Sequence, residues 1–186
     1  MYIIGFDIGG TKIEGSLFCF GNNEQNIETH SSFEIQGKKD SIVSGFLCAK
    51  KRILSERHLG YEQILDKIVK LIDDLCNESK LSKQLLSAIG LSVPGPVDQA
   101  HQLIRASNSM IFANRDLVQD IKQKTQLSIP FLIENDANCF AYAEAYCGAG
   151  LEFFKNKGVP VAQQVSLGLI LGSGFGGGVI IQGRIF

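Results

Sequence analysis

A short segment near the start of the chain carries residue types that can hold a phosphate. Gly9 and Gly10 let successive backbone N–H groups face phosphate oxygens, while Thr11 adds a hydroxyl donor and Lys12 a positive charge. The preceding Asp7 could hold Mg²⁺ through water, because hard cations prefer carboxylate oxygens and retain much of their hydration. The segment predicts ATP chemistry, with an ordinary glycine hairpin turn as the alternative.

The flanking residues decide which kind of phosphate loop this is. Tyr2–Phe6 is a short apolar run, and Ile13–Phe20 has the period of two that is typical of a strand. P-loops and dinucleotide loops instead lead into a helix whose N-terminal amides help to hold the phosphate. Both of those folds are therefore disfavoured.

A second polar group follows a predicted buried strand, Ile129–Ile133. Glu134, Asn135 and Asp136 come directly after it and precede an alanine-rich segment predicted to be a helix. Ligands of α/β sheets bind at the carboxyl ends of strands, and a carboxylate there can take the proton of a sugar hydroxyl. Asp136 is thus a candidate general base, and its alternative role is that of a helix N-cap.

A second glycine-rich run lies near the end of the sequence. Val165–Leu171 is an apolar strand, followed by Gly172–Gly178 and by another predicted strand, Val179–Ile181. Three of these glycines fit the dinucleotide-binding spacing, but the helix that this motif requires is missing, so we reject that match. The run resembles the first hairpin in form. Two such hairpins suggest a nucleotide held between two related domains.

Strands and helices alternate between these segments. Tyr61–Leu75 has the clearest helical stripe, and Leu86–Val93 is a strand that runs into the rigid turn Pro94–Asp98. Asp116–Thr125 is predicted to be a helix and Ile27–Ile35 a strand. An initial hairpin followed by this alternation indicates an α/β fold.

The stretch Lys38–Arg57 is basic, and its apolar residues Ile42, Phe46, Ala49 and Ile53 recur at helical spacing. We predict an amphipathic helix or a loop excursion there. Its charges would form a solvated face or, alternatively, a surface that binds a partner.

Composition excludes several classes of function. In 186 residues, 45% are hydrophobic and the formal net charge is −1, so neither nucleic acid nor membrane is an expected partner. The apolar start lacks the features of a signal peptide, and no run is long enough to span a bilayer. Five widely spaced cysteines form no zinc set with the histidines, and reduced thiols predict a cytoplasmic protein.

Four motifs, in order and spacing, resemble the ROK (repressor, open reading frame, kinase) family of sugar kinases: Asp7–Lys12, Pro94–Asp98, Asn135–Cys139 and Leu169–Gly178. The resemblance implies an actin and hexokinase-like (ribonuclease H-like) ATPase fold. Residues 1–133 would form the N-terminal α/β domain, and residues 134–186 would begin a second α/β domain that is incomplete.

The resemblance also implies roles for individual residues. Asp136 would be the base that accepts the proton of the sugar's 6-hydroxyl, and Gly95, Asn108 and Asn135 would line the sugar pocket. ATP and Mg²⁺ would be the cofactors, with no residue assigned as a direct metal ligand. The residues expected to hold the nucleotide are Asp7, Gly9, Gly10, Thr11, Lys12, Gly172, Ser173, Gly174, Gly176 and Gly177.

Within the family, Asn135–Glu144 and Leu167–Gly178 look most similar to bacterial N-acetylglucosamine kinases, which makes N-acetyl-D-glucosamine the expected substrate. The alternatives are a glucokinase or fructokinase of the same family, or a catalytically inactive sugar-binding fragment or regulator. Ser173 replaces the usual threonine but keeps a hydroxyl. The residues after Asn108 depart from the family's Asn-x-Pro-Gly-Trp, which leaves the sugar open.

The sequence ends at Phe186, before the family's Glu-x-Gly-His motif, its cysteine zinc cluster and its adenosine-contacting helices. We therefore expect either an N-terminal portion of a longer kinase or a natural truncation, with little or no kinase activity of the chain alone. In the full-length protein, the missing part could hold a structural Zn²⁺ and the chain could form a homodimer.

Overall fold

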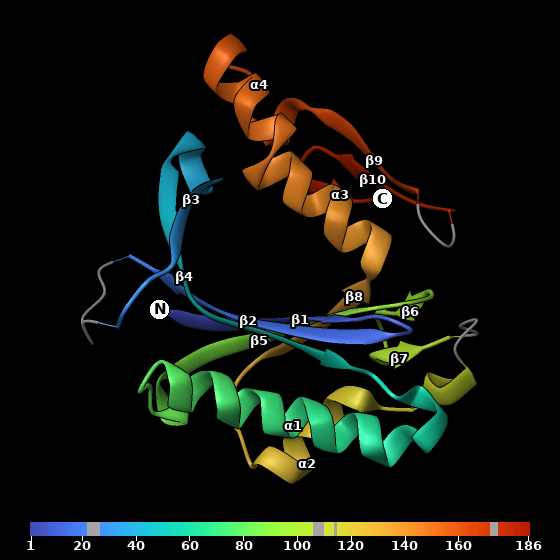
Figure 1. The fold of residues 1–186 in the computed structure, drawn as a ribbon. Coiled ribbons are helices and arrows are strands. Elements are labelled where there is room, and N and C mark those ends of the chain that lie inside the picture. Colours follow the sequence, from blue (N-terminus) through green and yellow to red (C-terminus); the bar gives the residue numbers. More distant parts are fainter. Residues whose placement is uncertain (22–26, 106–109, 114, 172–174) are drawn as a thin grey trace. The chain divides into compact units, whose positions relative to one another are not determined.

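The computed structural model of the protein describes residues 1–21, 27–105, 110–113, 115–171 and 175–186. The chain divides into two compact units. The first consists of Met1–Ser31 and Phe46–Asn135, and the second of Ser32–Gly45 and Asp136–Phe186. Both units combine strands with helices, as Figure 1 shows, so the predicted α/β class is confirmed. The division into domains at residue 133 stays a prediction.

The predicted N-terminal hairpin is present. β1 (Tyr2–Ile8) pairs antiparallel with β2 (Lys12–Phe20), with Ile8 opposite Ile13 at the closed end. β5 (Leu86–Val93) lies parallel to β1, and β8 (Phe131–Asn135) lies parallel to β5. With β3 (Ser31–Gln36) and β4 (Ile42–Leu54), the sheet has the order β3-β4-β2-β1-β5-β8.

The prediction of a helix or loop within Lys38–Arg57 is wrong, because most of this stretch is the strand β4. The basic side chains point alternately to the two faces of the strand. Lys50 and Arg52 pair with Glu14 on β2, whereas Lys51 pairs with Asp74 on the helix that follows. Helical spacing of four apolar residues was misleading here, because sheet partners distant in sequence determine the structure.

Two helices cover the same face of the first unit's sheet in Figure 1. α1 (Tyr61–Glu78) buries the whole predicted stripe. α2 (Leu117–Thr125) begins after Asp116, whose carboxylate accepts a hydrogen bond from Gln119 N at 2.9 Å. The Tyr61 hydroxyl donates to Asp120 at 2.6 Å and so links the two helices. Among the described helices, none is long and apolar enough to cross a membrane.

Several short elements connect these strands and helices. β6 (Val97–Asp98) and β7 (Leu103–Ile104) form a small hairpin after the turn that begins at Pro94. The 3₁₀ turns are η1 (Lys38–Asp40), η2 (Arg57–Leu59), η3 (Lys83–Leu85), η4 (Met110–Phe112) and η5 (Val161–Gln163).

The second unit packs α3 (Asp136–Cys147) against a sheet of order β11-β10-β9. The strands are β9 (Val165–Leu171), β10 (Phe175–Ile181) and β11 (Arg184–Ile185). α4 (Ala149–Lys157) follows α3. The buried side chain of Gln36, on β3, accepts a hydrogen bond from Val161 N at 2.9 Å and ties that strand into this unit.

Small residues bring the backbone of α3 close to the strands. Ala137, Ala141 and Ala145 are the buried residues of the helix. A Cβ on Gly168 would lie 2.6 Å from the Cα of Ala141, and one on Gly178 would lie 2.7 Å from the carbonyl oxygen of Ala137. Real side chains do not fit at such distances, so glycine is required where the helix crosses the strands.

This packing corrects the sequence-based interpretation of Gly172–Gly178 as a turn. The described glycines Gly176, Gly177 and Gly178 lie within β10, opposite residues of β9. Glycine in β10 allows α3 to pack close to the strand, whether or not these residues also bind phosphate. Consecutive strand residues face opposite sides of a sheet, so neighbouring glycines have different surroundings.

We predict that Gly178→Ala lowers the free energy of unfolding by about 1–3 kcal/mol, because the added methyl group overpacks against the α3 backbone. Gly177→Ala is the matched control: its Cβ would meet only the flexible end of Leu169 at 3.2 Å and, at 3.5 Å, the carbonyl oxygen of Gly168. Urea unfolding of both variants measures the difference. Equal stability of the two variants would contradict this account of the helix–sheet contact.

Candidate active site

The first glycine hairpin brings five predicted nucleotide-binding residues together. Gly9, Gly10 and Thr11 connect β1 to β2, and the N–H of Gly9 donates to the carbonyl oxygen of Lys12 at 2.9 Å. The side chains of Asp7, Thr11 and Lys12 belong to exposed residues at this end of the sheet. The hairpin can therefore present backbone donors, a hydroxyl, a cation and a carboxylate to one ligand.

The end of β4 holds this hairpin in place. Ser55 is buried; its hydroxyl donates to Gly10 O and its N–H to Thr11 O, each at 2.9 Å. Lys67, on α1, donates to Leu54 O at 2.9 Å and pairs with Glu56. These hydrogen bonds fix the backbone of the turn relative to the end of β4.

Arg57 is a second cation at the hairpin that the sequence analysis missed. Its Nη1 lies 3.0 Å from the position that a Cβ on Gly10 would take, so the guanidinium rests on the glycine turn. Within the ranges that the structure describes, no carboxylate pairs with it. Arg57 was missed because β4 was not predicted as a strand. The extended course of β4 is what brings Arg57 next to the Gly9–Gly10 turn.

The carboxylate of Glu14 lies on β2 opposite Asp7. Burial raises the pKa of Glu14, but the pairs with Lys50 at 2.7 Å and Arg52 at 2.5 Å outweigh burial and lower it. These two cations of the basic stretch are therefore paired within the sheet, and the role of the stretch stays a prediction.

Two predicted sugar-pocket residues also meet. Gly95 has a φ of 96°, which a residue with a side chain rarely adopts, and its carbonyl oxygen accepts a hydrogen bond from Asn135 Nδ2 at 3.0 Å. Asn135 is the last residue of β8 and faces the turn that follows β5. Asn108, the third predicted pocket residue, lies outside the described residues.

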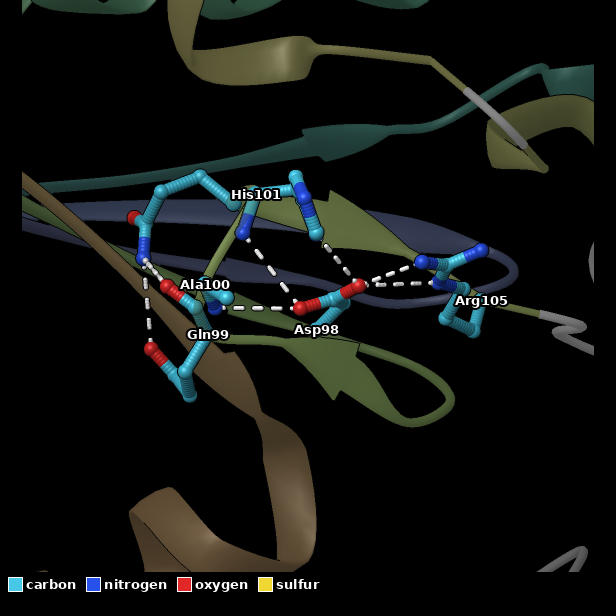
Figure 2. A network of polar contacts seen from close by, with 6 residues as sticks. Asp98, Gln99, Ala100, His101 and Arg105 are labelled. Carbon is cyan, nitrogen blue, oxygen red and sulfur yellow. Dashed lines mark hydrogen bonds and ion pairs between the residues drawn. The ribbon is translucent and has the colours of Figure 1, made fainter.

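A polar network fixes the small hairpin that follows Gly95, as Figure 2 shows around Asp98. One carboxylate oxygen of Asp98 accepts from Ala100 N at 3.0 Å and from His101 N at 3.3 Å. The other accepts from Arg105 Nε at 3.2 Å and contacts His101 Nδ1 at 2.9 Å. The Arg105 guanidinium, followed by His101, holds the pKa of Asp98 well below its usual range.

Asp136 is the first residue of α3, as predicted, and belongs to the second unit. Its Oδ1 accepts a hydrogen bond from Ala137 N at 2.8 Å, which orients the carboxylate at the helix start. This contact matches the predicted capping position at the start of the helix, and the base role of Asp136 stays a prediction. Of the second glycine run, Gly172, Ser173 and Gly174 lie outside the described residues.

Comparison with known proteins gives consistent matches over nearly the whole chain. The ROK family model matches residues 3–186. An N-acetyl-D-glucosamine kinase of Mannheimia succiniciproducens is 32% identical over 183 residues, 98% of this chain and 47% of that protein. The chain spans about half the length of the curated relatives that it matches.

Solved structures confirm the fold class. The ROK hexokinase of Thermus thermophilus matches with a TM-score of 0.63 and 24% identity over 100% of this chain and 47% of that one. A ROK family glucokinase of Streptomyces griseus, solved with glucose and AMPPNP, matches with a TM-score of 0.67 and 22% identity over 100% and 46%. The predicted actin and hexokinase-like ATPase fold and the predicted family are therefore both confirmed.

Proposed function

The chain belongs to the ROK family, and we propose that the protein transfers the γ-phosphoryl group of ATP to a hexose or N-acetylhexosamine. The observation that carries this proposal is the position of Asn135 at the carboxyl end of β8, where its side chain donates to Gly95 O in the turn after β5, with Asp136 as the next residue in the sequence. Ligands of α/β sheets bind at such strand ends. An amide and a carboxylate supply the donors and acceptors that a sugar hydroxyl needs.

The proposed reaction needs one proton acceptor. Asp136 accepts the proton of the sugar's 6-hydroxyl, whose oxygen attacks the γ-phosphorus as the bond to the β–γ bridging oxygen breaks and ADP leaves. Asn135, Gly95 and Asn108 hold the sugar. Because phosphoryl transfer relies mainly on positioning and charge stabilisation, a fixed Asn135 contributes by keeping the hydroxyl in line.

The phosphates of ATP are proposed to lie on the first hairpin, with the backbone N–H groups of its turn, Thr11 and Lys12 as donors. Arg57 adds a guanidinium there, and the second glycine run contributes further backbone donors from Gly172–Gly174 and from Gly176 and Gly177. The exposed carboxylate of Asp7 is the oxygen donor that suits Mg²⁺, held through water. The ion would neutralise charge on the β- and γ-phosphates.

N-acetyl-D-glucosamine is the proposed substrate and its 6-phosphate the product. The support is the name shared by the curated relatives, which are about one-third identical to this chain. Consumption of ATP, with sugar and nucleotide as the small-molecule partners, fits the cytoplasmic location expected from the sequence.

We predict that, in the full-length protein, Asp136→Asn lowers turnover at least about 100-fold, because the amide cannot take the hydroxyl proton. Sugar binding, measured by calorimetry, should be largely retained. The control is Asp66→Asn, which removes an exposed carboxylate of α1 that pairs with Lys124 at 2.6 Å. Release of ADP in the presence of N-acetyl-D-glucosamine measures turnover. Near-normal turnover of the Asp136 variant would show that another group is the base.

We predict that, in the full-length protein, Arg57→Gln raises the KM for ATP about tenfold, because it removes a charge-assisted hydrogen bond to phosphate. Arg52→Gln removes the same charge from a residue engaged with Glu14 and should leave this KM nearly unchanged. Initial rates at varied ATP concentration distinguish the two variants. An equal rise in the KM for ATP in both variants would mean that the net positive charge, and not a direct contact of Arg57 with phosphate, is responsible.

A further inference from the structure

The carboxylate of Glu134 connects the strand that ends at Asn135 to the hairpin that follows Gly95. Its Oε1 accepts a hydrogen bond from the N–H of Asn135 at 2.7 Å, and its Oε2 accepts one from Gln99 Nε2 at 2.7 Å. Both acceptors are ionised oxygens, and hydrogen bonds to an ionised group are roughly twice as strong as neutral ones. The side chain thus fixes the backbone just before the proposed base.

Gln99 completes the connection from the hairpin side. Its Nε2 also donates to the carbonyl oxygen of Ile133, at 3.2 Å. Gln102 donates to both Gln99 O and Gln99 Oε1 at 3.2 Å, and Figure 2 shows Gln99 beside Asp98. An exposed glutamine is usually free to rotate, but this one is held by contacts on two sides.

The contacts form a closed ring. Asn135 is held through its N–H by Glu134, and its side chain donates to Gly95 O at 3.0 Å. Gly95 and Gln99 belong to one short loop, whose turn is organised by Asp98. Moving any one member therefore displaces Asn135 relative to Gly95.

We propose that Gln99 and Glu134 are positioning residues for the sugar, acting through Asn135 and Gly95. This inference rests on the proposed function. It assigns the pair no chemical step: Gln99 donates to Glu134, and Glu134 aligns the amide that would bind a hydroxyl of a hexose or hexosamine. Loss of the pair should affect sugar affinity and turnover, and leave nucleotide affinity unchanged.

The test is a charge swap across the pair, made in the full-length protein. Gln99→Glu places two carboxylates where a donor now meets an acceptor, and the KM for N-acetyl-D-glucosamine should rise about tenfold while kcat falls. The double variant Gln99→Glu/Glu134→Gln restores one donor and one acceptor between the two positions, so it should recover most of the loss. The KM for ATP and the thermal unfolding midpoint should stay at wild-type values throughout. Gln63→Glu adds the same charge to an exposed position of α1 and is the control.

The outcomes distinguish failure of the positioning role from failure of the proposed kinase function. A wild-type protein that phosphorylates the sugar, with a Gln99→Glu variant equal to it, overturns the positioning role alone. A double variant no better than the single one, or a matching rise in the KM for ATP, also overturns it. A wild-type protein that neither binds nor phosphorylates hexoses or hexosamines overturns the proposed function and the positioning role together.

Discussion

The parallel pairing of β5 with β8 is the constraint on which the candidate sugar site depends. Val93 lies opposite Asn135 at the last step of this pairing, so the turn after β5 emerges next to the end of β8. Parallel strands present their carboxyl ends at the same edge of a sheet, and hydrogen bonds from Asn135 and Gln99 then join the two ends. A shift in strand register would separate Gly95 from Asn135 and would disperse the proposed pocket.

The packing of α3 plays the corresponding part in the second unit. Alanine on the helix and glycine on β9 and β10 allow a backbone approach that larger residues would block. Since Asp136 begins this helix, the same contact fixes the start of α3 relative to the strand that carries Gly176 and Gly177. Some glycines of the second run therefore have a packing role. Gly178 contacts the α3 backbone and Gly177 does not, so substitutions at single positions can distinguish packing from phosphate binding.

Local patterns predicted much of this structure. β5 and β9 have the predicted bounds, and the stripe of α1 is buried as expected, because strand and helix periods are properties of short segments. β4 was missed because its ion pairs join it to Glu14 and Asp74, which are distant in sequence. Arg57 and Gln99 were missed for the same reason: an arginine and a glutamine have no local signature, and only tertiary contacts give them a role. Glu134 was noticed as part of the polar group after the strand, but its contact with Gln99 could not be predicted from the sequence.

The central claim is that phosphate passes from ATP to a sugar hydroxyl. Phosphorus NMR of the purified full-length protein with ATP, Mg²⁺ and N-acetyl-D-glucosamine tests it most directly, because it distinguishes a sugar ester from free phosphate. The account predicts a growing sugar 6-phosphate signal matched by ADP, and no such signal when the sugar is omitted. Unchanged ATP, or ATP converted only to ADP and inorganic phosphate, would contradict it.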